Sequence, residues 1–215
     1  CTAPLSDELI QRSGMRDRGH TEIFKRICRK QDLHMGFWGP SFSVVLATDH
    51  IPLEQVSRAL KKGALKTALT ACGEMMRILG ARHRSPFFVL GLNPHAGNKG
   101  IIGTDESSWI QKEITSFLGS ESNTWTEVAP IVPADSAFVR KQLKNKPLFL
   151  ALYHDQGLIP FKMAHGFGAA VHLTLGLDFL RTSVDHGTAF DIFGKNKARP
   201  ESMIAALEFH FRRKV

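Results

Sequence analysis

The sequence predicts an α/β protein built on a mainly parallel sheet with helices on both faces. Two observations predict this class. Short apolar runs rich in β-branched residues recur along the chain, and amphipathic segments with helical spacing separate them. The composition agrees, because 43% of the 215 residues are hydrophobic and 22% are charged, which is ordinary for a soluble protein with a substantial core.

Four apolar runs are predicted to be buried strands, at residues 41–48, 87–92, 147–153 and 170–175. The longest helix is expected after the first run, because apolar residues recur at helical spacing from Leu53 to Leu79 and the pattern stops at Gly80. Shorter helices are expected at residues 104–117, at 135–144 and from Pro200 onward. Acidic residues near their starts suit the positive end of a helix dipole.

Charge, cysteine content and hydropathy narrow the class of protein. The formal net charge of +8 favours anionic partners, but the basic residues are scattered along the chain, so nucleic-acid binding is not expected. A small phosphorylated substrate and a dinucleotide would explain the same charge. Cys1, Cys28 and Cys72 show no CxxC spacing, so no disulfide framework or cysteine zinc site is indicated. No apolar run approaches the ~20 residues of a membrane span, and a cytoplasmic protein is expected.

Three predicted strands end in a histidine: His50, His95 and His154. The carboxyl ends of neighbouring parallel strands share one edge of a sheet, where ligand crevices form. Three neutral imidazoles at that edge could hold one divalent cation, with an open position facing a substrate. The alternative is that each histidine is an ordinary hydrogen-bonded loop residue.

Two further segments and two cations are candidates for ligand binding. The glycine-rich turn from Asn93 to Gly103 precedes a helix and suits an anion, although a tight connection between a strand and a helix would look the same. The polar run at residues 181–200 suits either a dinucleotide or a solvated surface loop. Lys162 and Arg181 suit phosphate or carboxylate, but scattered surface cations are the alternative.

Several blocks of the sequence match one family in the same order. They are GHTEIF from Gly19, ATDHIPL from Ala47, GLNPHAG from Gly91, YHDQGLIPFK from Tyr153 and LGLDFLRTSVDHGTAFDIFGK from Leu175. These blocks closely resemble the signature blocks of the 4-hydroxythreonine-4-phosphate dehydrogenase family of vitamin B6 synthesis. The resemblance implies a fold like that of isocitrate and isopropylmalate dehydrogenases, and it implies that the family's N-terminal third is missing here.

The resemblance also implies roles for particular residues. The implied metal ligands are His50, His95 and His154, and the implied substrate contacts are His20, Thr21, Lys162, His172 and Arg181. The implied nicotinamide-cofactor contacts are His186, Gly187, Thr188 and Asp191, and the implied catalytic residues are Lys162 and Asp155. His172 departs from the family pattern, which usually has asparagine at this position, and it can hydrogen-bond but also become charged.

The activity implied by the resemblance is oxidation of 4-phosphohydroxy-L-threonine by NAD or NADP, assisted by a divalent metal (zinc, magnesium or cobalt), to a 3-oxo acid that decarboxylates. A homodimer with a shared active site is implied as well. Residues 1–160 are expected to form a metal-binding and dimerisation domain, and residues 161–215 part of a cofactor and substrate domain. Two alternatives stay open: a paralogue acting on 4-phospho-threonate or 4-phospho-erythronate, and a truncated, non-catalytic metal-binding remnant.

Overall fold

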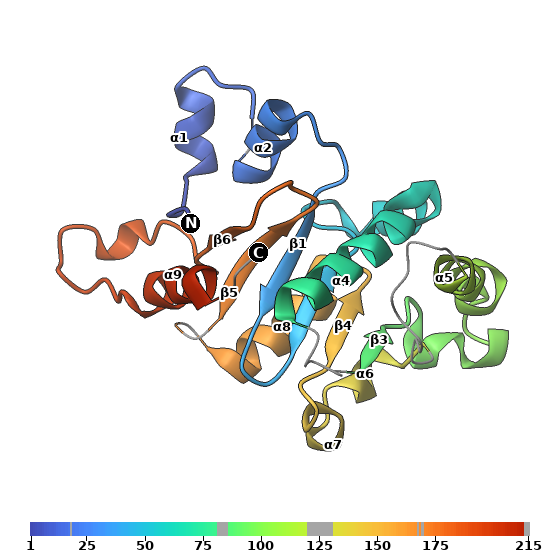
Figure 1. Ribbon diagram of the computed structural model, residues 1–215. Coiled ribbons are helices and arrows are strands. Elements are labelled where there is room, and N and C mark those ends of the chain that lie inside the picture. The colour runs from blue at the N-terminus through green and yellow to red at the C-terminus, as the bar shows by residue number, and fades with distance from the viewer. Residues whose placement is uncertain (18, 81–85, 120–130, 167, 169, 213–215) are drawn as a thin grey trace.

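The fold centres on a six-stranded sheet (Figure 1). The structure is a computed structural model, and it describes residues 1–17, 19–80, 86–119, 131–166, 168 and 170–212. The strand order is β3-β4-β2-β1-β5-β6. The strands are β1 (His34–Trp38), β2 (Ser43–Leu46), β3 (Phe87–Val89), β4 (Leu148–Ala151), β5 (Val171–Leu175) and β6 (Arg181–Ser183). All four predicted strands are present, as β2, β3, β4 and β5.

The α/β class is confirmed, but the sheet is mixed. Strands β2, β4 and β3 run parallel, whereas β1 is antiparallel to both β2 and β5, and β5 is antiparallel to β6. The reason lies in the connection between β1 and β2, which is only residues 39–42 long. Such a short connection can only join antiparallel strands, since a parallel pair needs a long crossover.

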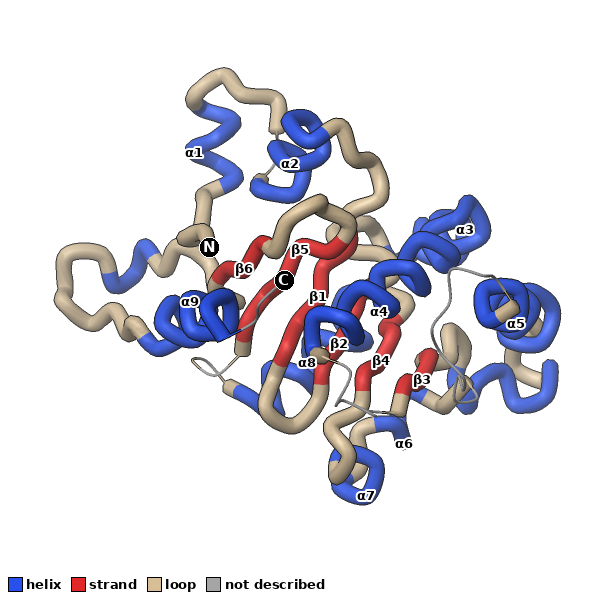
Figure 2. Tube along the Cα trace, in the orientation of Figure 1, coloured by secondary structure: helices blue, strands red, loops and turns tan. Residues whose placement is uncertain are grey.

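Helices cover both faces of the sheet (Figure 2). The α-helices are α1 (Asp7–Arg12), α2 (His20–Cys28), α3 (Val56–Ala59), α4 (Leu65–Leu79), α5 (Gln111–Leu118), α6 (Ala134–Ala137), α7 (Arg140–Leu143), α8 (His154–His165) and α9 (Glu201–Arg212). Helices α4, α5 and α9 pack with one face of the sheet in the larger apolar cluster. Helices α6 and α8 pack on the opposite face in the second cluster.

The remaining helical turns are 3-10 or π in character. They are η1 (Leu53–Gln55), the π-turn η2 (Leu60–Ala64), η3 (Pro94–Gly100), the π-turn η4 (Glu106–Ile110) and η5 (Phe190–Ile192). The predicted helix at 53–79 is therefore interrupted. Its break falls at η2, where Gly63 has a φ of 110°, a conformation that glycine adopts without steric cost.

Helix α8 lies close against the sheet because it carries a glycine where the two meet. A Cβ at Gly157 would come within 2.7 Å of Val44 Cγ1 on β2 and 2.8 Å of Ala151 Cβ on β4. The glycine thus permits the close approach that brings the inner face of α8 to the carboxyl ends of β2 and β4. The sequence did not predict α8, because Gly157 and Pro160 disrupt its helical pattern.

Helices α1 and α2 lie together at one end of the sheet (Figure 1). An ion pair between Arg26 and Asp17 of 2.7 Å holds the segment before α2 onto that helix. Among the helices of the described segments, none combines the length and apolarity that a bilayer crossing requires. Residue 160 lies within α8, and β5 and β6 belong to the same sheet as the other strands, so the division of the chain into two domains at this point stays a prediction.

Candidate functional site

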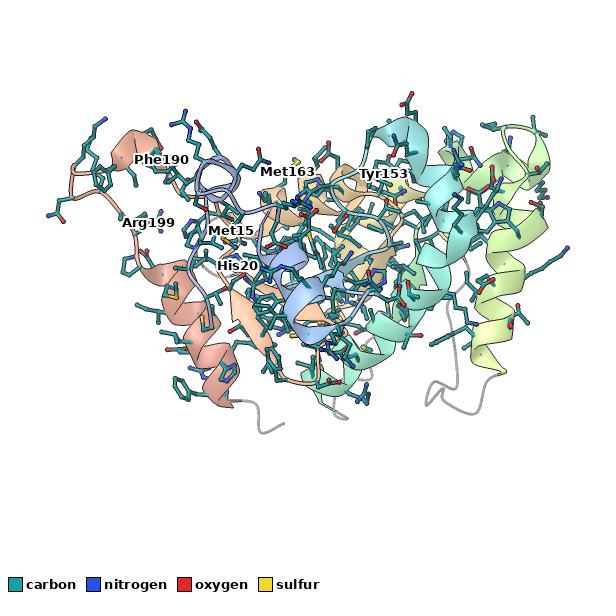
Figure 3. The ribbon with its side chains drawn as sticks, turned by 90° about the horizontal axis from the view of Figure 1, so that it is seen from above. Met15, His20, Tyr153, Met163, Phe190 and Arg199 are labelled. Atoms are coloured by element: carbon teal, nitrogen blue, oxygen red, sulfur yellow. The ribbon has the colours of Figure 1, made fainter. Side chains whose placement is uncertain are left out.

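A pocket of about 740 Å³ opens between α2, α8 and the β5–β6 side of the sheet. It gathers all five residues expected to bind substrate: His20, Thr21, Lys162, His172 and Arg181. Two expected metal ligands, His50 and His154, and two expected cofactor contacts, His186 and Gly187, also line it. In Figure 3, His20 lies over the centre of the molecule, whereas Phe190 and Arg199 lie on a loop that projects to one side.

Two helices each contribute a row of side chains to this pocket. His154, Leu158 and Lys162 follow one another at intervals of four residues on α8, so they share one face of the helix. On α2, Thr21 and Lys25 are spaced in the same way. Lys25 was not predicted as a site residue, and its helical spacing from Thr21 would have indicated it had α2 been recognised.

Arg181 is a buried cation at the floor of the pocket, with 4% of its surface exposed. Its Nη1 donates to Thr174 Oγ1 at 2.9 Å and its Nη2 donates to Thr2 Oγ1, while its guanidinium carbon lies 5.5 Å from the centre of the Phe24 ring. None of the ion pairs among the described residues includes Arg181, and its Nε–H has no hydrogen-bond partner there.

Burial lowers the pKa of Arg181 to about 10, so the side chain stays charged at neutral pH. A buried charge without a counter-ion is unfavourable unless a partner of opposite charge binds. The geometry around Arg181 therefore suits an anion, and a guanidinium can bind phosphate or carboxylate through two hydrogen bonds.

His172 lies beside Arg181 and is held as a neutral ring. His172 Nδ1 lies 2.9 Å from Ser183 Oγ and 3.2 Å from Arg181 Nη1. Burial, with a smaller contribution from Arg181, lowers the pKa of His172 to about 3. The ring stacks on Phe37 with 4.9 Å between centroids. Its Nε2 is buried and has no hydrogen-bond partner among the described residues.

Replacing His172 with asparagine should flatten the pH dependence of stability. The pKa of His172 lies near 3 in the folded protein and near ~6.5 in the unfolded chain. Between these values the unfolded chain binds a proton that the folded protein excludes, so stability falls as the pH drops below ~6.5. Urea unfolding at pH 7, 6, 5 and 4.5 should give a slope up to about 1.4 kcal/mol per pH unit smaller for His172→Asn than for the wild type.

The comparison with the wild type isolates this effect. His34 and His165 also have a pKa lowered by burial, but both are present in the two proteins. Parallel stability curves for His172→Asn and the wild type would show that His172 is protonated freely in the folded state.

His50 and His154 come together at the ends of the adjacent strands β2 and β4, with 5.2 Å between their ring centroids. Two imidazoles bound to one tetrahedral zinc ion would place their ring centres about 5 Å apart, so the pair fits a divalent metal. His154 Nδ1 lies 2.6 Å from Asp155 Oδ1. A carboxylate in this position orients a metal-binding imidazole and leaves its Nε2 available.

His95 does not join this pair. It lies on η3, where residues His95 to Lys99 all have positive φ values between 44° and 79°, and its side chain is 66% exposed. No group of three histidine, cysteine or carboxylate side chains within the described ranges is placed to hold a metal ion. Convergence of the three predicted histidines within one chain is therefore not observed, and the metal site stays a prediction.

The position of His95 has a physical cause. Strand β3 is separated from β2 by β4, and the left-handed turn after it directs the chain outward. The turn is supported by Glu106, a buried carboxylate that accepts hydrogen bonds from the backbone N–H of Asn93 at 2.7 Å and from its side-chain amide at 3.0 Å. Gly97 is required there, because a Cβ would lie 2.5 Å from the Gly103 carbonyl oxygen.

The other predicted residues lie at the edge of the site. Thr188 and Asp191 are exposed on the loop after β6 and do not line the pocket, whereas His186 and Gly187 do. Asp155 is exposed and lines a smaller neighbouring hollow with His50 and His154. It contacts His154, and its expected catalytic role stays a prediction.

Fold and pocket define the class: an α/β protein with a pocket that contains a buried arginine beside a pair of imidazoles. The chain belongs to the family of pyridoxal phosphate biosynthetic protein PdxA, whose model matches residues 1–210. It is 39% identical over 210 residues to a 4-hydroxythreonine-4-phosphate dehydrogenase from Acidithiobacillus ferrooxidans, covering 96% of this chain and 61% of the relative. A relative from Oceanobacillus iheyensis, named as a D-threonate 4-phosphate dehydrogenase, is 35% identical over 207 residues, with 96% and 61% covered.

The solved structures agree. A 4-hydroxythreonine-4-phosphate dehydrogenase from Klebsiella pneumoniae superposes with a TM-score of 0.81 and 32% identity, covering 98% of this chain and 63% of that one. The chain therefore spans less than two thirds of the length of these relatives.

Proposed function

We propose that this chain forms the larger part of a metal-assisted, nicotinamide-linked dehydrogenase that oxidises 4-phosphohydroxy-L-threonine in pyridoxal phosphate biosynthesis. The observation that carries the proposal is the buried guanidinium of Arg181, which has no ion-pair partner among the described residues, in a pocket that also contains His50 and His154. The names of the relatives support the reaction class.

The cationic side of the pocket supports an anionic substrate. Lys25 and Lys162 line it together with Arg181, from α2, α8 and β6 respectively. Phosphate carries more charge and more acceptor oxygens than a single carboxylate, so a phosphorylated acid makes fuller use of these cations. His172 Nε2, which has no hydrogen-bond partner among the described residues, can add a hydrogen bond on the same side.

The metal would be held by His50 and His154 of one chain and by His95 of a second copy. This arrangement accounts for the exposure of His95 on a rigid turn and for the incomplete histidine set within one chain. A bound divalent cation would acidify a substrate hydroxyl and polarise the carbonyl that replaces it. Asp155 would orient His154, and Lys162 would accept or donate a proton on the substrate side.

The nicotinamide cofactor, NAD or NADP, is assigned to the loop after β6. His186 and Gly187 face the pocket, and Thr188 and Asp191 extend the loop away from it, so a dinucleotide bound along the loop would reach the substrate with one end. The cofactor supplies the hydride acceptor, and the protein positions it.

Two variants should complement each other if the site is shared between subunits. His50→Ala and His95→Ala should each bind less metal and show hydride transfer reduced by at least about 100-fold, since each lacks one ligand. After unfolding and refolding the full-length variants together, roughly a quarter of the wild-type activity should return, because heterodimers restore one intact site in two. Nicotinamide absorbance and elemental analysis measure both quantities.

If the mixed variants form dimers but stay inactive, the site is not shared between subunits. The three histidines then either bind the metal within one chain or do not bind it. A wild type that binds metal and phosphorylated ligand but transfers no hydride to either nucleotide would favour the remnant hypothesis instead. A phosphorylated threonate or erythronate is the second candidate substrate, favoured by the name of the Oceanobacillus relative.

A further inference from the structure

Asp185 is a buried carboxylate in the pocket that none of the roles above uses. It follows β6, has 8% of its surface exposed and lines the same pocket as Arg181. Alternate residues of an extended segment share one face, which explains why Arg181, Ser183 and Asp185 all contribute to the lining.

Only one oxygen of this carboxylate is engaged. Ser202, a buried residue in the first turn of α9, donates from Oγ to Asp185 Oδ1 at 3.0 Å. Oδ2 is buried and has no hydrogen-bond partner among the described residues, and the ion pairs found there do not include Asp185. A carboxylate oxygen can only accept, so the group that is missing is a donor.

Both ring nitrogens of His165 are already engaged. His165 lies close enough to sense the charge of Asp185, but its Nδ1 lies 2.9 Å from the Phe161 carbonyl oxygen and its Nε2 accepts from the backbone N–H of Ser41 at 3.1 Å. A buried, ionised carboxylate left without a partner is strongly unfavourable, and a cation offsets that cost more fully than a neutral donor.

We propose that Asp185 is a further specificity-determining residue, which binds the ammonium group of a phosphorylated amino acid. The inference rests on the proposed function, because it concerns the same pocket. The substrates in the names of the two kinds of relative differ in one group. 4-Hydroxythreonine carries an ammonium group beside its carboxylate, whereas threonate carries a hydroxyl there. Arg181 and Asp185 give the pocket an anion receptor and a cation receptor, and a phosphorylated amino acid bears both charges.

Asp185 also has a possible structural role, since its bond to Ser202 joins the end of β6 to the start of α9. That role predicts equal effects on every ligand of the pocket. A role in recognising ammonium predicts an effect on one ligand and not on the other. The ratio of two dissociation constants therefore separates the two roles.

The experiment is calorimetric titration of the full-length, metal-loaded protein without nicotinamide nucleotide, using 4-phosphohydroxy-L-threonine and D-threonate 4-phosphate. Asp185→Asn keeps the shape of the side chain and removes its charge. It should raise the dissociation constant of the amino acid by at least about tenfold and that of the threonate by less than about threefold. Ser202→Ala, the matched control, keeps the charge and should change both constants by less than about threefold.

Equal losses for the two ligands, or no loss for the amino acid, would overturn the proposal. If Asp185→Asn does not fold, the two dissociation constants of the wild type test the proposal. The wild type must bind the amino acid at least about tenfold more tightly than the threonate. Failure of the proposed function would appear differently, as normal binding of both ligands with no hydride transfer from either.

Discussion

Replacing Arg181 with alanine should raise the dissociation constant for a phosphorylated substrate by at least about 30-fold. Truncating one partner of a buried, hydrogen-bonded charge pair costs about 2–5 kcal/mol, and 2 kcal/mol corresponds to a factor of roughly 30. The loss should be larger than for any exposed cation of the pocket, because Arg181 is 4% exposed and its charge is little screened by water.

Titration calorimetry with 4-phosphohydroxy-L-threonine checks this, with Arg12→Ala as the matched control. Arg12 forms an exposed ion pair with Glu8 on α1, with 73% of its side chain exposed, and its removal should leave the affinity unchanged. The melting temperature of the unliganded Arg181→Ala protein should change little, because the lost hydrogen bonds to Thr2 and Thr174 are offset by the removal of a buried charge that has no ion-pair partner among the described residues. Unchanged affinity in a folded Arg181→Ala protein would remove the anion site from the proposal.

Replacing Gly157 with alanine should lower the free energy of unfolding by about 1–3 kcal/mol, the usual cost of overpacking a core. The added methyl would lie 2.7 Å from Val44 Cγ1, 2.8 Å from Ala151 Cβ and 3.1 Å from Leu46 Cδ2, so α8 must move away from β2 and β4. Because α8 carries His154 and Lys162, ligand affinity should fall together with stability.

Gly73 provides the matched control, because it lies within α4 and a Cβ there would meet no atom within 4 Å. Gly73→Ala should stabilise the protein by about 0.4–1 kcal/mol, as alanine has the higher helix propensity and the less flexible unfolded chain. Urea unfolding of both variants measures the difference. Similar effects of the two substitutions would show that α8 does not depend on a close approach at Gly157.

The sequence predicted the strands that are continuous apolar runs, such as β2 and β4, and missed β6, whose buried residues Arg181 to Ser183 are polar. His50 and His154 follow β2 and β4, and their ring centroids lie 5.2 Å apart. Strand β1 was missed because the run from His34 to Trp38 contains a glycine and a histidine and does not read as apolar. Hydrophobic periodicity alone could not indicate that this strand reverses the direction of its neighbours.

The expected substrate contacts came from the family resemblance, and the tertiary contacts around them could not be read from local sequence. The five expected substrate contacts all line one pocket, although the spacing of the residues by itself left Lys162 and Arg181 open to a surface interpretation. The outward position of His95 follows from five consecutive left-handed residues, of which only Gly97 and Asn98 are of types that favour that conformation. The engagement of only one oxygen of Asp185 depends on Ser202 of α9, which no local pattern reveals.

The reversed strand β1 also bears on how the protein folds. His34 of β1 pairs with Leu175 of β5, and Ser43 of β2 pairs with Leu148 of β4, so the centre of the sheet joins segments that are synthesised far apart in time. Pairings of such long sequence separation are slow to form, because the intervening chain must be ordered first. The surroundings of Arg181, which bonds to Thr2 across 179 residues of sequence, should therefore form late in folding, and ligand binding to this pocket should report completed folding more faithfully than helix content does.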